Sequence, residues 1–129
     1  DAEVRGATGT LRVKVGSGDV TVLDSGTLDV VSVGSGDLEV RDVRGEATVG
    51  DIGSGDVQIH TVQRSLAVES LGSGDLVVTG VVGGVSIGSI GSGDATISDV
   101  GEGLRVRRIG SGDVSHRDVR GPVELPSDD

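Results

Sequence analysis

Acidic side chains recur at one fixed place in this sequence, and they are the residues best suited to chemistry. Each follows a Gly-Ser-Gly triplet, and the resulting tetrapeptide Gly-Ser-Gly-Asp occurs six times in 129 residues. Carboxylate oxygens are ligands that Ca²⁺ prefers in proteins, so a column of them predicts a cation site. The candidate metal ligands are Asp19, Asp37, Asp56, Asp75, Asp94 and Asp113.

A purely structural role for these carboxylates is the alternative, and we favour it. An Asp in a turn accepts hydrogen bonds from backbone N–H groups of its own turn. Such bonds offset the repulsion between like charges about 5 Å apart, which is roughly 1 kcal/mol per pair in water. The Ca²⁺-binding nonapeptide Gly-Gly-x-Gly-x-Asp has a different spacing, so its metal sites are not transferred to this chain. Apart from the Ca²⁺ hypothesis, we expect no cofactor.

The two histidines fit no catalytic arrangement. His60 falls on an outward position, where we expect it to be solvated, and His116 falls on an inward position, where we expect it to cap the last repeat. Ser115, His116 and Asp118 are the residue types of a catalytic triad. Adjacent strand residues point to opposite faces, however, so the serine and the histidine do not meet. We therefore expect no enzyme activity.

A basic patch interrupts the acidic sequence near its C-terminal end. Ion pairing with neighbouring carboxylates at the surface is the default interpretation, and contact with an anion or a glycan is the alternative. The patch consists of Arg105, Arg107, Arg108, Arg117 and Arg120, and the nearby carboxylates are Asp99, Glu102, Asp118 and Glu124.

A regular repeat must position these residues, because the tetrapeptide recurs every 18 or 19 residues. A fixed period near 20 residues is the signature of a solenoid. With the first Gly as position 1, apolar residues recur at positions 5, 7, 10, 14, 16 and 19. Positions 5 and 7 alternate like strand residues, as do positions 14 and 16, so each rung holds two strands. We predict an all-β, single-domain parallel β-solenoid (β-helix) of about seven rungs of 19 residues, right-handed by the crossover rule.

One domain accounts for residues 1–129. A partial rung covers residues 1–15, with Asp1 in the place of the repeat aspartate. Rungs begin at residues 16, 34, 53, 72, 91 and 110, and a C-terminal tail covers residues 121–129. The rung from Gly16 is one residue short, so we expect a tighter turn near Asp24–Ser25.

Two glycines flank the serine of every tetrapeptide. Glycine either supplies a positive φ or removes a side chain from a crowded corner, and both roles fit the pattern. The glycines with this structural role are Gly16, Gly18, Gly34, Gly36, Gly53, Gly55, Gly72, Gly74, Gly91, Gly93, Gly110 and Gly112.

The composition argues against several classes of function. The formal net charge of −10 opposes binding to nucleic acid and docking on an anionic membrane, and no run is apolar enough for membrane insertion. The chain has no aromatic residues to line the cleft of a sugar-cleaving β-helix. Outward positions 6 and 15 hold mixed residues rather than the regular threonine array of an ice-binding face.

The recurring Ser-Gly-Asp-Val-x-Val unit resembles the bacterial adhesin-like domains of unknown function, including the autotransporter-adhesin-head-like group. The resemblance covers essentially the whole chain. It implies a β-solenoid in an exported or envelope-associated protein. It implies no catalytic or binding residues, because none are established for that family.

These observations together predict a noncatalytic structural or adhesin-like module of the bacterial envelope: extracellular, at the cell surface or in the periplasm. Open solenoid ends present unpaired strand edges, so we expect self-association through the ends, up to the length of a filament. A cell-surface or glycan ligand is a further expected partner. The alternative function is a Ca²⁺- or glycan-binding module that uses the Asp column or the Arg patch.

Overall fold

The computed structural model describes residues 2–124, of which residues 2, 5, 7 and 8 are described by their backbone alone. The described residues form strands and short turns, with no helix among them. The strands are β1 (Ala2–Val15), β2 (Val20–Val33), β3 (Leu38–Val43), β4 (Ala47–Ile52), β5 (Val57–Val62), β6 (Leu66–Leu71), β7 (Asp75–Val81), β8 (Val85–Ile90), β9 (Asp94–Val100), β10 (Leu104–Ile109), β11 (Asp113–Val119) and β12 (Val123–Glu124).

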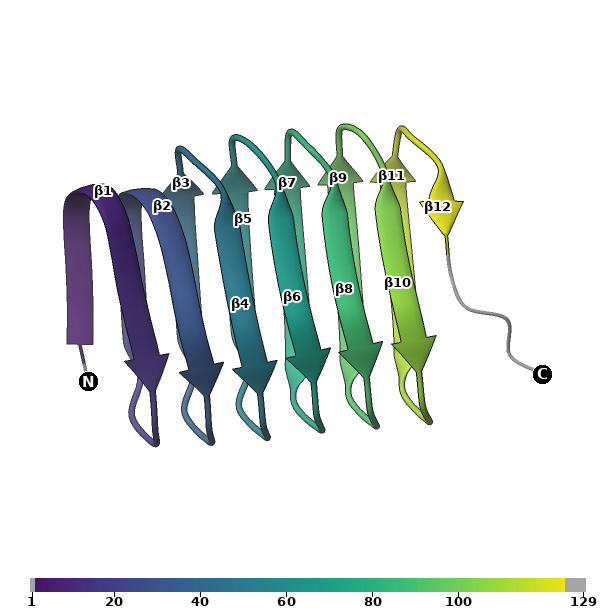
Figure 1. Ribbon diagram of the computed structural model, residues 1–129, viewed down its shortest axis with the longest axis horizontal. Helices are drawn as coiled ribbons and strands as arrows, with labels where there is room; N and C mark the ends of the chain where they lie inside the picture. The colour runs from purple at the N-terminus through teal and green to yellow at the C-terminus, as the bar shows by residue number, and fades with distance from the viewer. Residues whose placement is uncertain (1, 125–129) are drawn as a thin grey trace.

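All strand pairs are parallel, and the strands form two opposite faces of a flattened coil (Figure 1). One face, called here the odd face, contains β3, β5, β7, β9 and β11, and the even face contains β4, β6, β8, β10 and β12. The first two strands bend around a corner without a break and contribute to both faces. This arrangement confirms the predicted parallel β-solenoid.

The coil is right-handed, as expected from the crossover rule. In Figure 1 the chain advances from left to right, while the nearer strands run downward and the farther strands run upward. The coil makes about six turns of roughly 19 residues, slightly fewer than the seven rungs predicted. The count is lower because the first and the last rungs are incomplete, and Asp1 and residues 125–129 of the expected tail lie outside the described residues.

Identical repeat positions lie one above another in the core. Val57 pairs with Leu76, Ile59 with Val78 and Val62 with Val81. These and the other residues at the six apolar positions are buried through the middle of the stack, with exposed fractions of 0–3% from Val22 to Val106. β-Branched side chains suit such ladders because their χ1 angles are already restricted. The prediction of the core is therefore confirmed position by position.

A left-handed residue explains why two residues, not one, separate the inward positions 7 and 10. Position 9 has a positive φ in every described rung from Gly16 onward: Asp24 (61°), Asp42 (59°), Thr61 (60°), Gly80 (77°), Asp99 (57°) and Asp118 (55°). This conformation bends the strand and re-aims the next side chain, so position 10 returns to the core. Asp and Gly adopt it more readily than most residues.

The short rung differs from the prediction in the place of its missing residue. Leu23 pairs with Arg41 and Ser25 with Val43, so the rung is still in register at Asp24–Ser25. The register then moves by one residue before Leu28, which pairs with Ala47. The predicted site of tightening was therefore wrong: the tighter corner is Gly26–Thr27. As a consequence, Ser25 occupies the apolar position 10 and is fully buried.

Candidate functional site

The Gly-Ser-Gly-Asp corners lie at the bottom of the coil in Figure 1, where each near strand turns into the next far strand. A Cβ atom added to Gly55 would overlap the carbonyl oxygen of Gly36, and one added to Gly74 would overlap that of Gly55. Among the described residues, no glycine of these corners has a positive φ. Of the two roles that the sequence left open, the structure therefore supports removal of a side chain from a crowded corner.

Backbone hydrogen bonds tie each corner to the corner before it. Gly53 N donates to Val33 O at 2.7 Å, and the amide groups of Ser54 and Gly55 both donate to Gly34 O at 3.0 Å. The same pattern recurs one rung later, where Ser73 N and Gly74 N donate to Gly53 O at 3.0 and 3.1 Å. The corner is thus a rigid ladder of backbone, and it holds each aspartate at the entry to the next strand.

The six candidate aspartates form the predicted column. Asp94 pairs with Asp75 and with Asp113 in the strand ladder, and all six side chains are exposed. The Oδ1 atom of Asp56 accepts a long hydrogen bond of 3.4 Å from the amide of Asp75. We expected such bonds within the aspartate's own turn, whereas this one reaches the next rung. Charge repulsion in the column is therefore relieved mainly by solvent.

A cation at this column would find few protein ligands in one place. Among residues 2–124 there is no group of three or more His, Asp or Glu side chains close enough to share a metal ion. Three of the aspartates (Asp19, Asp37 and Asp56) border an open hollow of about 230 Å³ together with Glu39 and Gln58. Ca²⁺ takes six to eight oxygen ligands, so most of them would have to be water. The Ca²⁺ site stays a prediction.

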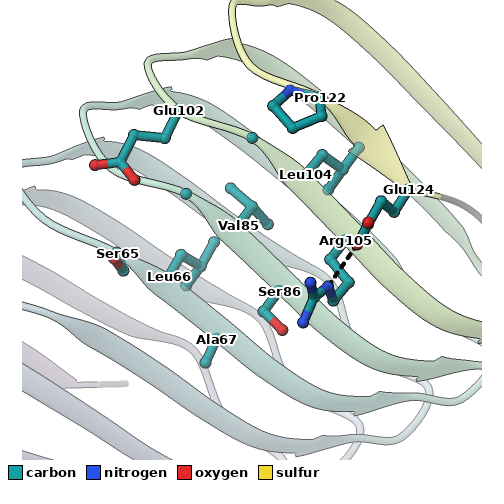
Figure 2. A pocket seen from close by; sticks show the side chains of 12 residues that line it. Ser65, Leu66, Ala67, Val85, Ser86, Glu102, Leu104, Arg105, Pro122 and Glu124 are labelled. Carbon is teal, nitrogen blue, oxygen red and sulfur yellow. Dashed lines mark hydrogen bonds and ion pairs between the residues drawn. The ribbon is translucent and has the colours of Figure 1, made fainter.

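The Arg patch lies near the C-terminal end of the rod, and one of its members is paired as expected. Arg105 Nε lies 2.7 Å from Glu124 Oε2, and both side chains are mostly exposed. Figure 2 shows this pair at one side of a shallow hollow of about 430 Å³ on the even face, with Glu102 at the other side. Small residues such as Ala67 and Ser86 also line the hollow. Glycan contact by the patch stays a prediction.

The two histidines lie on different strands and differ in exposure. His60 is half-buried on β5, between Arg41 and Thr79 of the neighbouring rungs. His116 pairs with Ile97 at an inward position, yet it is exposed, because no described strand lies beyond β11. It therefore occupies the end of the core, where the sequence placed it.

The sequence analysis did not recognise that a second set of carboxylates shares one repeat position. Asp24, Asp42, Asp99 and Asp118 share the left-handed position 9. Asp99 and Asp118 border an open hollow on the odd side of the rod together with the exposed Val82, and Asp24 pairs with Arg44 at 2.8 Å. Four of the six residues at this position are Asp and one is Gly, types that tolerate a positive φ, but Thr61 interrupts the pattern.

Comparison of the chain with protein-family models, with curated protein sequences and with solved structures gives no match. The β-solenoid implied by the resemblance to adhesin-like domains is confirmed by the strand pairing, but membership of that family has no support from these comparisons. No helix in the described part of the chain has the length and apolar character needed to cross a membrane.

Proposed function

We propose that this chain is a noncatalytic structural module of the bacterial envelope or cell surface, of adhesin-like character, which assembles end to end. The observation that carries the proposal is the contrast between the sides and the ends of the rod. The sides consist of paired strands with shallow, open hollows. Within the described residues, the outer edges of β1 and β11 have no neighbouring strand.

Both ends also leave part of the core uncovered. Val4 and Leu11 at the first rung, and Val114, Val119 and Val123 at the last, are only partly buried against the core. The same repeat positions are fully buried inside the stack, for example at Val22 and Leu28. Unpaired strand edges with adjoining apolar side chains favour pairing with another chain.

Electron microscopy of the purified 129-residue chain tests this proposal. We expect rods longer than the single coil, whose length is roughly 30 Å at about 4.8 Å per rung, and we expect the distribution of lengths to shift upward with concentration. Analytical ultracentrifugation over the same concentrations gives an independent measure. Monomers alone at the highest concentration would contradict end-to-end assembly.

Cation binding by the Asp column is the second candidate function. It is favoured by the exposure of all six carboxylates along one edge of the rod. A column of this kind would bind Ca²⁺ between neighbouring rungs, with water completing the coordination. Thermal melts with and without Ca²⁺, compared between the unmodified chain and the Asp56→Asn/Asp75→Asn variant, test it.

A further inference from the structure

We infer that the partner at each end is a second copy of this chain, stacked head to tail so that β1 of one copy pairs with β11 of the next, repeat position for repeat position. The inference rests on the proposed end-to-end assembly and adds its polarity and register. In this arrangement the ladder of parallel strands continues across the junction. A contact between two equivalent ends could not preserve that parallel pattern.

The register follows from the pairing already present at the two ends. At the last rung, Ser115 pairs with Thr96 and His116 with Ile97. At the first rung, Glu3 pairs with Thr21 and Val4 with Val22. Both sets obey the same repeat frame, so continuing the frame by one rung places Glu3 beside Ser115 and Val4 beside His116.

The apolar rims of the two ends match in this register. Val123 on β12 falls opposite Leu11 of the next copy, and both are only partly buried in the single coil. Across the same junction, Val114 and Val119 would be covered by the backbone of β1. The stacked contact would thus bury the remaining apolar surface of both ends, which favours association.

Charges on the even face select the polarity. At position 15, Arg12 lies beside Asp29 of the next rung (3.4 Å), and Arg105 lies beside Glu124 (2.7 Å). Glu124 is the outermost residue of this column at one end and Arg12 the outermost at the other. Head-to-tail stacking brings these two opposite charges together and continues the pattern of neighbouring opposite charges.

Two features of the same register weaken the contact and make it reversible. Position 7 holds Val or Ile in the rungs below, but it holds His116 at the C-terminal end. Burying an imidazole in place of an aliphatic side chain costs free energy unless it finds a hydrogen bond. The charged groups nearest to it in sequence, Arg117 and Asp118, lie at the outward position 8 and the left-handed position 9. The net charge of −10 on each copy adds a general repulsion.

Engineered cysteines test the register directly, because the natural chain has none. Equal amounts of the single variants Glu3→Cys and Ser115→Cys are mixed at a concentration that gives long rods, and then oxidised mildly. Paired residues on neighbouring strands lie within the Cα separation of a disulfide. We expect a cross-linked dimer from the mixture, and peptide mapping should place the bond between residues 3 and 115.

The matched control is a mixture of Ser115→Cys with Gln58→Cys, which puts a thiol at the same repeat position in the middle of the rod, where it is exposed. We expect about tenfold less cross-linked dimer from this control, since only the first mixture holds its thiols at a high effective concentration. Cross-linking of either single variant with itself would overturn the head-to-tail polarity.

Rods that assemble but yield equal cross-linking in both mixtures would overturn the register and leave end-to-end assembly standing. An absence of rods for the unmodified chain would overturn both.

A second measurement uses charge reversal: Arg12→Glu should weaken assembly about three- to tenfold, as expected for the loss of an exposed ion pair and its replacement by repulsion. Arg41→Glu, the same change in the middle of the rod next to Glu39, should leave assembly within about twofold of the unmodified chain.

Discussion

The two corners of each turn differ in how strictly their sequence is specified. The Gly-Ser-Gly-Asp corner is the same in all six rungs. The opposite corner, at repeat positions 11–13 and at the top of Figure 1, changes from one rung to the next, as in Arg44-Gly45-Glu46, Gln63-Arg64-Ser65 and Gly101-Glu102-Gly103. Both corners reverse the chain and both pair with their neighbours, so the need for a turn does not explain the difference.

Crowding that recurs at one fixed repeat position from rung to rung explains it. At the constant corner, a Cβ atom on Gly36, Gly55 or Gly74 would overlap the carbonyl oxygen of the rung before it. At the variable corner the crowding changes from rung to rung: a Cβ atom on Gly83 would lie 2.6 Å from Arg64 O, whereas one on Gly84 would lie 3.2 Å from its nearest neighbour, Gly103 O. Arg64 and Glu102 carry long side chains at the repeat position that Gly83 occupies. A repeated motif in a solenoid can thus record a steric limit, and its constancy alone is no sign of a binding site.

The largest expected effect comes from adding a methyl group at the constant corner. Gly74→Ala should lower the free energy of unfolding by about 2–4 kcal/mol, because the new methyl group meets backbone that cannot move without breaking the ladder. The chain has no aromatic residues, so urea unfolding is followed by far-UV circular dichroism.

Gly84→Ala is the matched control at the variable corner, and we expect it to change stability by no more than about 0.5 kcal/mol. Equal losses for the two substitutions would contradict the steric explanation of the constant motif. A harmless Gly74→Ala would point instead to selection for a function at that corner.

The fold could be predicted from the sequence because the period of the repeat gives the length of one turn of the solenoid. Six positions with fixed apolar character define which side chains point inward, and stacking identical rungs leaves little else to decide. The tighter corner was misplaced for a physical reason: Ser25 is polar, and nothing in its residue type indicates that it fills position 10. Pairing with Val43 on the next rung was needed to show it.

The candidate site was predicted less completely. The Asp column lies where the sequence placed it, since it is one residue from a buried ladder position. The left-handed position 9 was not recognised, because Asp, Thr and Gly share no obvious property until their backbone angles are known. Exposure of His116 likewise depends on what lies beyond the last strand, which repeat position alone does not determine.

The next largest effect concerns Ser25, at the start of the shortened variable corner. Its hydroxyl is fully buried and, in the described structure, has no hydrogen-bond partner. Ser25→Ala should raise the free energy of unfolding by about 1–2 kcal/mol, because it removes the desolvation penalty of the unpaired group. Ser32→Ala, at a half-buried outward position of the same strand, is the control and should have little effect. A loss of stability in Ser25→Ala would indicate that the hydroxyl is hydrogen-bonded in solution.

A smaller gain is expected at Thr61, which leads into the variable corner with a φ of 60°. A β-branched residue is unfavourable in this conformation, whereas Asn tolerates it. Thr61→Asn should therefore raise the melting temperature, with a gain of about 0.5–1 kcal/mol in the free energy of unfolding. Thr96→Asn, in the regular strand β9, should instead be neutral or slightly destabilising, because Thr favours strands. An equal loss of stability in both variants would contradict the claim that the positive φ at this position disfavours Thr relative to Asn.

The smallest effect is expected at the aspartates of the constant corner. Asp56 and Asp75 are exposed, and a single long hydrogen bond links the Asp56 carboxylate to the next rung. The double variant Asp56→Asn/Asp75→Asn should therefore change the free energy of unfolding by no more than about 0.5 kcal/mol, since lost repulsion offsets the lost bond.

Thermal melts with and without Ca²⁺, at matched ionic strength, then distinguish the two interpretations of the column. A ligand that binds only the folded state raises its melting temperature. If the column serves only the turn, neither protein responds to Ca²⁺, whereas a rise in the unmodified chain that the double variant lacks would favour the cation-binding function.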